Sequence, residues 1–239
     1  AVADERDRVY ANRRRAYGLF GRDTDTVVHA HLVHGATVAR VTTAENGTWV
    51  RHVDGLVTDQ PGCVLTMSFA DCAPIVLYDP VHRAIGLGHA GWKGAVADLP
   101  GALVRAMGEQ FGSDPADLLA AVGPCIGPCC YEVGEIVIDA VRAAFASPDE
   151  LLHRKSMPAH QATTDNHPPP APCYSTTDLL ATDHRLHFDL PEANRRNLLN
   201  AGVRHVELAE HCTACRTDLF FSHRAEKGRT GRFGVVLGL

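Results

Sequence analysis

The chain has 239 residues, 45% of them hydrophobic, and a formal net charge of -5. This is enough for one core, so we expect a single domain over residues 1–239. The negative charge argues against a nucleic-acid binder, and no apolar run approaches the ~20 residues that cross a bilayer. The first residues show no secretory signal. We therefore expect a cytoplasmic protein that binds neither nucleic acid nor membrane, whose eight cysteines are reduced thiols, metal ligands or nucleophiles.

The hydrophobic periodicity and the turn residues predict more short strands than helices. In chain order they predict a helix at 4–19, strands within 27–35, 36–42, 54–58, 63–70, 74–80 and 83–91, a helix at about 95–111, a strand at 118–123, helices at 134–145 and near 190–199, and strands at 203–210 and 233–239. The Pro- and His-rich stretch at about 147–185 is expected to be an exposed insertion with little structure of its own.

Strands and helices do not alternate regularly along the chain, and no GxGxxG or P-loop pattern is present. The order of elements therefore predicts a mixed α/β fold, a layered sandwich of mixed β-sheets flanked by helices. A doubly wound nucleotide-binding fold is disfavoured.

Three segments carry the candidate chemistry: LVHG at 32–35, FADCAP at 69–74 and GHAGWKG at 88–94. They place His34, Cys72 and His89 at the ends of predicted strands, where a scaffold presents reactive groups. Two imidazoles and one thiolate suit zinc, and three protein ligands leave the open position of a catalytic site. Their spacing matches no compact zinc signature. A packed cysteine beside two hydrogen-bonded histidines therefore remains the structural alternative.

Several short motifs occur here in one order: LVHG, DGLVT, ADCAP, HAGWKG, VGPCIGPCCYEVG, AGV, HCT, FFSHR and GR. This ordered set closely resembles the YfiH family, also called the multicopper polyphenol oxidase or laccase-domain family. The resemblance runs from about residue 4 to the end, apart from the insertion. It implies that His34, Cys72 and His89 bind one zinc ion. It also implies a layered fold shared with a cytotoxic-necrotizing-factor-like cysteine hydrolase.

The same resemblance implies phosphorolysis of adenosine, inosine, guanosine and methylthioadenosine, with adenosine deaminase as a side activity. A purine nucleoside and phosphate are the implied partners. The chain departs from the family pattern at Leu32, where the family has Gln, and at Lys93, where arginine is commoner. The strand and Arg-Gly-Gly loop that open the family do not precede Ala1.

Other residues are candidates for supporting roles. Asp71 could shuttle a proton or orient a ligand histidine, or it could cap a turn. Lys93 could hold phosphate or stay exposed, and Trp92 could stack on a purine or pack in the core. Cys212 and His223 could line the pocket, and hydrogen bonding of His223 to the backbone is the alternative.

The remaining cysteines suggest a second metal site. Cys212-x-x-Cys215 with a distant pair from Cys125, Cys129 and Cys130 would form a closed structural zinc site, although the spacing of that pair is irregular.

Three other functions stay open at this point. Cys72 could be the nucleophile of a Cys-His hydrolase or amidase that acts on peptidoglycan precursors, with His89 or His34 as its base. Copper could take the place of zinc, because affinity favours copper, and give a copper-dependent, laccase-like polyphenol oxidase. One HxH pair and no His-Cys-His segment argue against a blue multicopper cluster. A zinc-stabilised binding module would unfold on chelation.

Overall fold

The computed structural model describes residues 5–154 and 185–239, which form helices and three β-sheets. In chain order the elements are α1 (Arg6–Gly18), β1 (Val28–His31), β2 (Val38–Arg40), β3 (Trp49–Arg51), β4 (Gly55–Thr58), β5 (Val64–Phe69), β6 (Ala73–Asp79), β7 (Ala84–Ala90), α2 (Trp92–Val96), α3 (Leu99–Phe111), β8 (Leu119–Val122), β9 (Glu132–Val133), α4 (Glu135–Ala144), β10 (Leu152–Arg154), β11 (Leu186–Phe188), α5 (Leu190–Asn200), β12 (His205–Leu208) and β13 (Phe233–Gly238).

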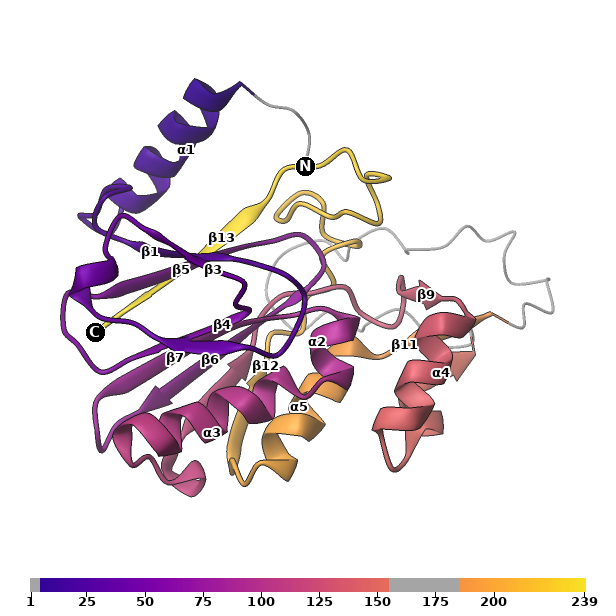
Figure 1. The fold of residues 1–239 in the computed structure, drawn as a ribbon. Coiled ribbons are helices and arrows are strands. Elements are labelled where there is room, and N and C mark those ends of the chain that lie inside the picture. The colour runs from indigo at the N-terminus through magenta and orange to yellow at the C-terminus, as the bar shows by residue number, and fades with distance from the viewer. Residues whose placement is uncertain (1–4, 155–184) are drawn as a thin grey trace, which may run out of the picture.

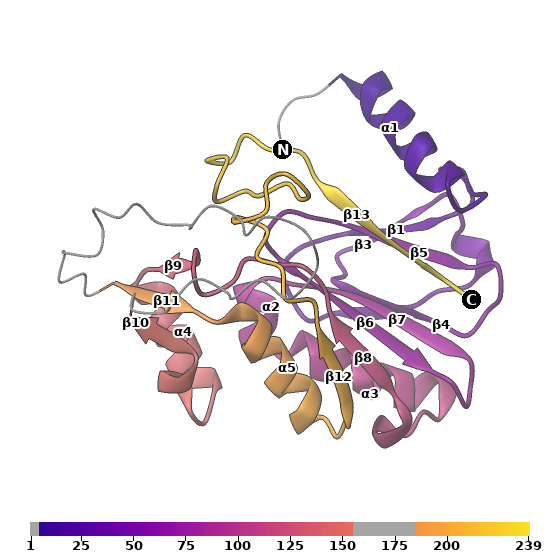
Figure 2. The same cartoon turned by 180° about the vertical axis from the view of Figure 1, so that it is seen from behind.

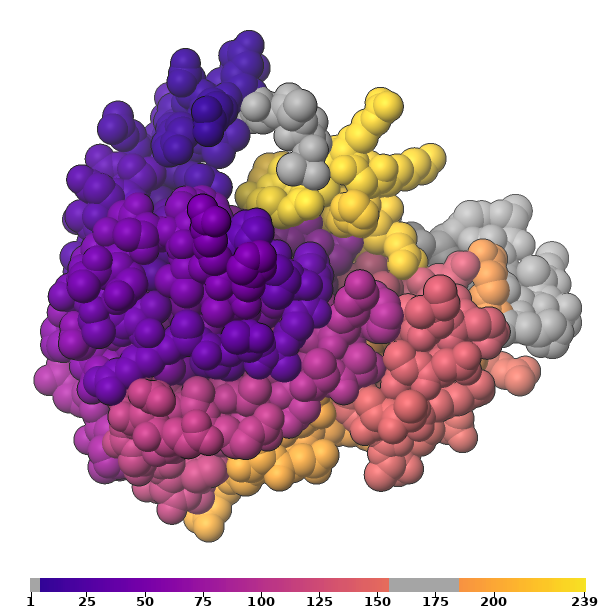
Figure 3. All heavy atoms as spheres, in the orientation of Figure 1, coloured from indigo at the N-terminus to yellow at the C-terminus, as the bar shows by residue number. Residues whose placement is uncertain are grey.

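Two mixed sheets lie face to face, and helices cover the outer face of one of them (Figures 1 and 2). The four-stranded sheet has the order β13-β5-β1-β3, and the six-stranded sheet has the order β12-β8-β6-β7-β4-β2. Helices α3 and α5 cover the other face of the six-stranded sheet (Figure 1). Helix α1 projects at the edge of the molecule with only Tyr17 buried (Figure 3). The mixed α/β prediction is confirmed.

Strand β7 shows why the layers pack as they do. Ile85 and Leu87 point into the core between the two sheets, and the glycines that alternate with them face the helices. A Cβ at Gly88 would clash with Leu103 of α3, so the helix can approach the sheet only over glycine. His89 continues the face of Ile85 and Leu87. Its imidazole therefore lies between the sheets, with its ring centroid 5.4 Å from that of Phe69.

The helix predicted at about 95–111 is two helices in the structure. Asp98 interrupts it with a left-handed backbone, φ 56°, and its carboxylate accepts a hydrogen bond from the N–H of Gly101 as the N-cap of α3. Strands β3, β9, β10 and β11 were not predicted, since each has only two or three residues. Most of the segment predicted as an insertion lies outside the described residues. Within the described ranges, no helix is both long and apolar enough to cross a bilayer.

Candidate metal and active site

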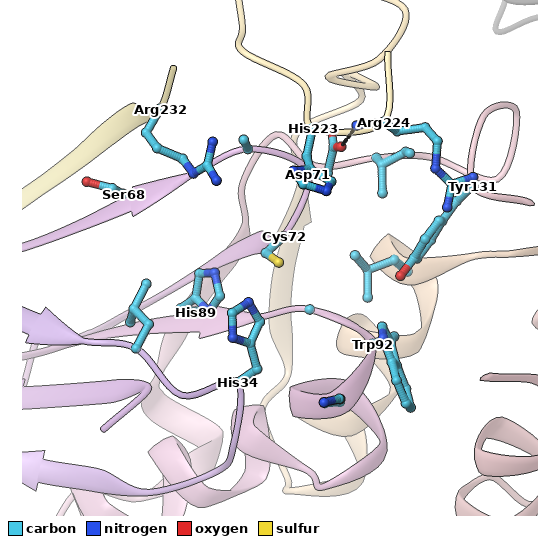
Figure 4. Close-up of a pocket in the computed structure, with 16 residues that line it drawn as sticks. His34, Ser68, Asp71, Cys72, His89, Trp92, Tyr131, His223, Arg224 and Arg232 are labelled. Atoms are coloured by element: carbon cyan, nitrogen blue, oxygen red, sulfur yellow. Dashed lines mark hydrogen bonds between the residues drawn. The ribbon is translucent and has the colours of Figure 1, made fainter. Parts of the chain in front are cut away.

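His34, Cys72 and His89 come together at one end of the two sheets (Figure 4). Each offers one ligand atom, and these atoms all lie within 4.8 Å of one another. Cys72 comes from the turn between β5 and β6, and His89 from the end of β7. Strands β6 and β7 are antiparallel neighbours, with Pro74 of β6 opposite His89 of β7. This register places Cys72 beside His89, and the loop after β1 adds His34.

The loop that carries His34 is held by a buried carboxylate. His34 has a left-handed backbone, φ 62°, which residues with a side chain rarely adopt. Asp54 accepts hydrogen bonds from the backbone N–H groups of Val33 (3.2 Å), His34 (2.9 Å) and Gly35 (2.7 Å). Three bonds to one carboxylate fix the loop in this conformation.

Asp54 also faces the second histidine. Its Oδ1 lies 3.4 Å from Nδ1 of His89, and Nδ1 has no closer hydrogen-bond partner within the described residues. Burial lowers the pKa of His89, but Asp54 and Cys72 outweigh it and raise the pKa to about 9. Since Nδ1 faces Asp54, the other ring nitrogen is left for a metal or a proton.

Cys72 is an activated thiol in this arrangement. Its burial raises the pKa, but hydrogen bonds and charge from His34 and His89 outweigh burial and lower the pKa to about 7. The thiol also needs Gly91 opposite it, because a Cβ there would lie 2.8 Å from Sγ of Cys72. The HAGW sequence thus contributes both a histidine and the space for the sulfur.

The cluster lines a cavity of about 540 Å³. Its walls combine polar, cationic, aromatic and aliphatic groups: Leu32, His34, Ser68, Ala70, Asp71, Cys72, His89, Gly91, Trp92, Lys93, Ile126, Tyr131, Leu190, His223, Arg224 and Arg232. In Figure 4 the aromatic rings of Trp92 and Tyr131 lie on one side of the cluster, and Arg232 lies on the other. Such a cavity has room for a small molecule with both an anionic and a planar apolar part.

Of the supporting candidates, Asp71, Trp92, Lys93 and His223 line the cavity. Asp71 accepts hydrogen bonds on both oxygens, from Oγ1 of Thr213 and from the backbone N–H of Arg224, each at 2.7 Å. Its carboxylate therefore joins the Cys72 turn to two C-terminal segments.

Lys93 and Trp92 lie beside each other in the cavity wall, whereas Cys212 lies outside the cavity. Nζ of Lys93 lies 5.6 Å from the centroid of the Trp92 ring. Cys212 is not among the cavity residues; it is buried, and its Sγ accepts a hydrogen bond from Gly127.

Sequence reasoning missed several residues that the fold brings to the site. Asp54 opens the DGLVT motif, Tyr131 follows the cysteine pair, and Arg224 and Arg232 end FFSHR and GR. The motifs that contain these residues were recognised in the sequence. The residues themselves could not be assigned to a site, because the side chains that they contact lie far away in the chain.

The donor set fits a zinc ion. Two imidazole nitrogens and one thiolate within 4.8 Å of one another are zinc's preferred ligands, and a buried Nδ1 facing a carboxylate is the usual support of a ligand histidine. With three protein ligands facing a cavity, the fourth position stays open to a small molecule.

Comparison with known proteins agrees with this architecture. The family model described as multi-copper polyphenol oxidoreductase laccase matches residues 1–239. The chain belongs to this laccase-domain family.

Purine nucleoside phosphorylase YlmD of Geobacillus stearothermophilus is 36% identical over 246 residues, covering 99% of this chain and 81% of that protein. Adenosine deaminase RL5, from an unknown prokaryotic organism, is 31% identical, covering 97% of this chain and 82% of RL5. The crystal structure of the Bacillus licheniformis hypothetical protein YfiH superimposes with a TM-score of 0.84 at 32% identity, covering 100% of this chain and 83% of that chain. These names place the chain among enzymes.

Proposed function

We propose that this laccase-domain protein is a zinc-dependent purine nucleoside phosphorylase. Its substrates would be adenosine, inosine, guanosine and methylthioadenosine, with deamination of adenosine as a side activity. One observation carries the proposal: an open three-ligand cluster of His34, Cys72 and His89 lies in a cavity that has both cationic and aromatic walls. The names of the relatives given above support the choice of substrate.

The cavity's own residues would divide the work of phosphorolysis. Phosphate attacks C1′ of the ribose as the bond to the base breaks, giving free base and ribose 1-phosphate. Arg232 would place the phosphate, since a guanidinium binds its oxygens, and Lys93 beside Trp92 would add positive charge to the cavity. Trp92 and Tyr131 lie together on one side of the cavity and would contact the planar base (Figure 4).

His34, Cys72 and His89 would hold the metal, and Asp54 would keep His89 oriented. When bound, zinc supplies Lewis acidity toward a substrate oxygen and acidifies a water for deamination.

A Cys72→Ala protein tests this function. It should lose the zinc bound in the cavity and release no free base from adenosine or inosine in the presence of phosphate. Cys63→Ala is the matched control, because Cys63 is fully buried and lies outside the cavity. Full phosphorolysis by Cys72→Ala would refute the proposal.

One observation favours a second candidate, a cysteine hydrolase or amidase. Cys72 with its pKa of about 7, His89 with its pKa of about 9 and Asp54 form a thiol–imidazole–carboxylate series. This candidate predicts amide hydrolysis in the presence of a chelator and loss of that hydrolysis after alkylation of Cys72. The phosphorylase predicts that the chelator itself abolishes turnover.

The family description also names a copper oxidase. Copper can displace zinc from the same ligands because affinity favours it. Oxidation of a phenol by the copper-loaded protein, with no phosphorolysis by the zinc-loaded protein, would favour that alternative.

A further inference from the structure

Four cysteines outside the cavity lie close together. They are Cys129, Cys130, Cys212 and Cys215, and their Sγ atoms all lie within 4.8 Å of one another. Sγ of Cys215 is 3.4 Å from that of Cys129 and 3.5 Å from that of Cys130. One pair comes from the loop between β8 and β9, and the other from the turn after β12. Cys125 is not part of the group; it pairs with Cys212 through a backbone bridge.

The separations match one tetrahedral ion. Zinc binds thiolates at about 2.3 Å, so neighbouring sulfurs of a tetrahedral site lie about 3.8 Å apart. The two sulfur–sulfur distances of 3.4 and 3.5 Å lie close to this value, and no distance within the group exceeds 4.8 Å. All four positions would be filled by the protein, which is the arrangement of a structural site and leaves no place for a substrate.

The surrounding backbone supports a thiolate at Cys212. Its Sγ accepts the N–H of Gly127 at 3.3 Å, and its carbonyl accepts the N–H groups of Cys215 and Arg216 at 3.1 and 3.0 Å. This is a tight Cys-x-x-Cys turn. The turn holds the Sγ atoms of Cys212 and Cys215 close to those of Cys129 and Cys130.

Cys215 takes part in a disulfide. Its thiolate becomes available when a dithiol reduces that bond: the disulfide becomes two thiols, and the dithiol becomes a disulfide. We propose that in the reduced protein Cys129, Cys130, Cys212 and Cys215 bind one zinc ion as a closed structural site, separate from the cavity cluster.

Such an ion would stabilise the two loops that position Arg224 and Asp71 in the cavity wall. Arg224, which lines the cavity, donates through Nη1 to the carbonyls of Cys130 (3.4 Å) and Glu132 (2.8 Å). Thr213, next to Cys212, donates to Asp71 beside the cavity thiol. The four cysteines therefore lie where the loop between β8 and β9 meets the turn after β12, next to the cavity. A metal cross-link there would hold both segments in place.

Zinc content of purified protein, before and after reduction by a dithiol, tests this proposal. Reduced wild-type protein should hold about two zinc ions per chain, and Cys212→Ser and Cys130→Ser should each hold about one. Unreduced wild-type protein should also hold about one. Equal zinc content in wild type and Cys212→Ser, or before and after reduction, would overturn the proposal.

Cobalt binding to reduced Cys72→Ala protein provides a test that does not depend on the folding of the Cys212 or Cys130 variants. This protein lacks the cavity thiolate, so any cobalt–thiolate absorption comes from the four cysteines. The absorption is measured without substrate, so the result does not depend on turnover. The four-thiolate site should give tetrahedral cobalt absorption with intense sulfur-to-metal charge transfer. Absence of that absorption would also overturn the proposal.

Discussion

Oδ1 of Asp54 lies 3.4 Å from Nδ1 of His89. The same carboxylate accepts the backbone N–H of His34, so one buried group orients both candidate ligand histidines. A carboxylate behind a ligand histidine fixes the ring and makes it more basic. The pKa of His89 is raised to about 9 in agreement with this role. Asp54 therefore connects the shape of the loop after β1 to the chemistry at the end of β7.

Replacing this carboxylate by an amide should weaken zinc binding. We expect Asp54→Asn to lower zinc affinity by about 10- to 100-fold, because the ligand histidines lose their orientation. Competition with a chromophoric chelator measures the change. Asp59→Asn is the control, since Asp59 pairs with Arg40 at 3.2 Å at the surface, where an ion pair contributes little. Equal affinity of the Asp54 and Asp59 variants would contradict the role given to Asp54.

Zinc affinity should depend on pH in a defined way. A ligand histidine must be neutral, and the raised pKa of His89, about 9, means that metal displaces its proton at every pH below 9. Affinity should therefore rise about tenfold per pH unit between 7 and 9 and level off above 9. Below pH 7 the rise should be steeper, because Cys72 is then protonated as well.

The same titration of Asp54→Asn provides the control for this assignment. Without the carboxylate the pKa of His89 falls, so the affinity should level off at a lower pH than in wild type. An unchanged profile would show that the titrating group is not His89.

The layered mixed α/β fold was predictable because alternating and β-branched segments mark buried strands. Strand β7 was found this way, with apolar residues on one face and glycines on the other. The break at Asp98 was missed because its left-handed N-cap depends on a side-chain bond to Gly101 that periodicity does not reveal. The very short strands β9 and β11 exist through pairing with one another, which local sequence does not encode.

The cluster of His34, Cys72 and His89 was proposed from residue types and the family resemblance, and the structure brings the three together. Asp54 was missed for a physical reason. A single buried aspartate has no spacing signature, and its function depends on loops 20 residues away and on a strand farther along the chain. Long-range contacts of this kind appear only once the sheets are assembled.

A methyl group at Gly91 should disturb the Cys72 thiol without replacing any candidate ligand. In Gly91→Ala the new Cβ would lie 2.8 Å from Sγ of Cys72, so the sulfur must move. Such overpacking costs about 1–3 kcal/mol, and we expect zinc affinity and turnover to fall about tenfold or more. Gly94→Ala is a matched control in the same segment, since its Cβ would meet no atom closer than 3.5 Å. Equal effects of the two substitutions would point to helix α2 and not to the thiol.

Arg232 should determine the affinity for phosphate if the proposed function holds. Its Nη1 donates to the carbonyls of Thr230 (3.2 Å) and Gly231 (2.6 Å), which anchors the side chain, and its guanidinium points toward the candidate ligands Cys72 and His89 (Figure 4). Hydrogen bonds to a charged group contribute about 1.5–3 kcal/mol, so Arg232→Met should raise the KM for phosphate about tenfold or more. The KM for the nucleoside should change little.

Arg229→Met provides the control for this prediction. Arg229 is exposed in the same segment, lies outside the cavity and loses the same charge. Initial rates at varied phosphate and fixed inosine would compare the two proteins, and the salt dependence of each would separate general charge attraction from direct contact. If both variants raise the KM for phosphate equally, the effect belongs to net charge, and Arg232 has no specific place in binding the anion.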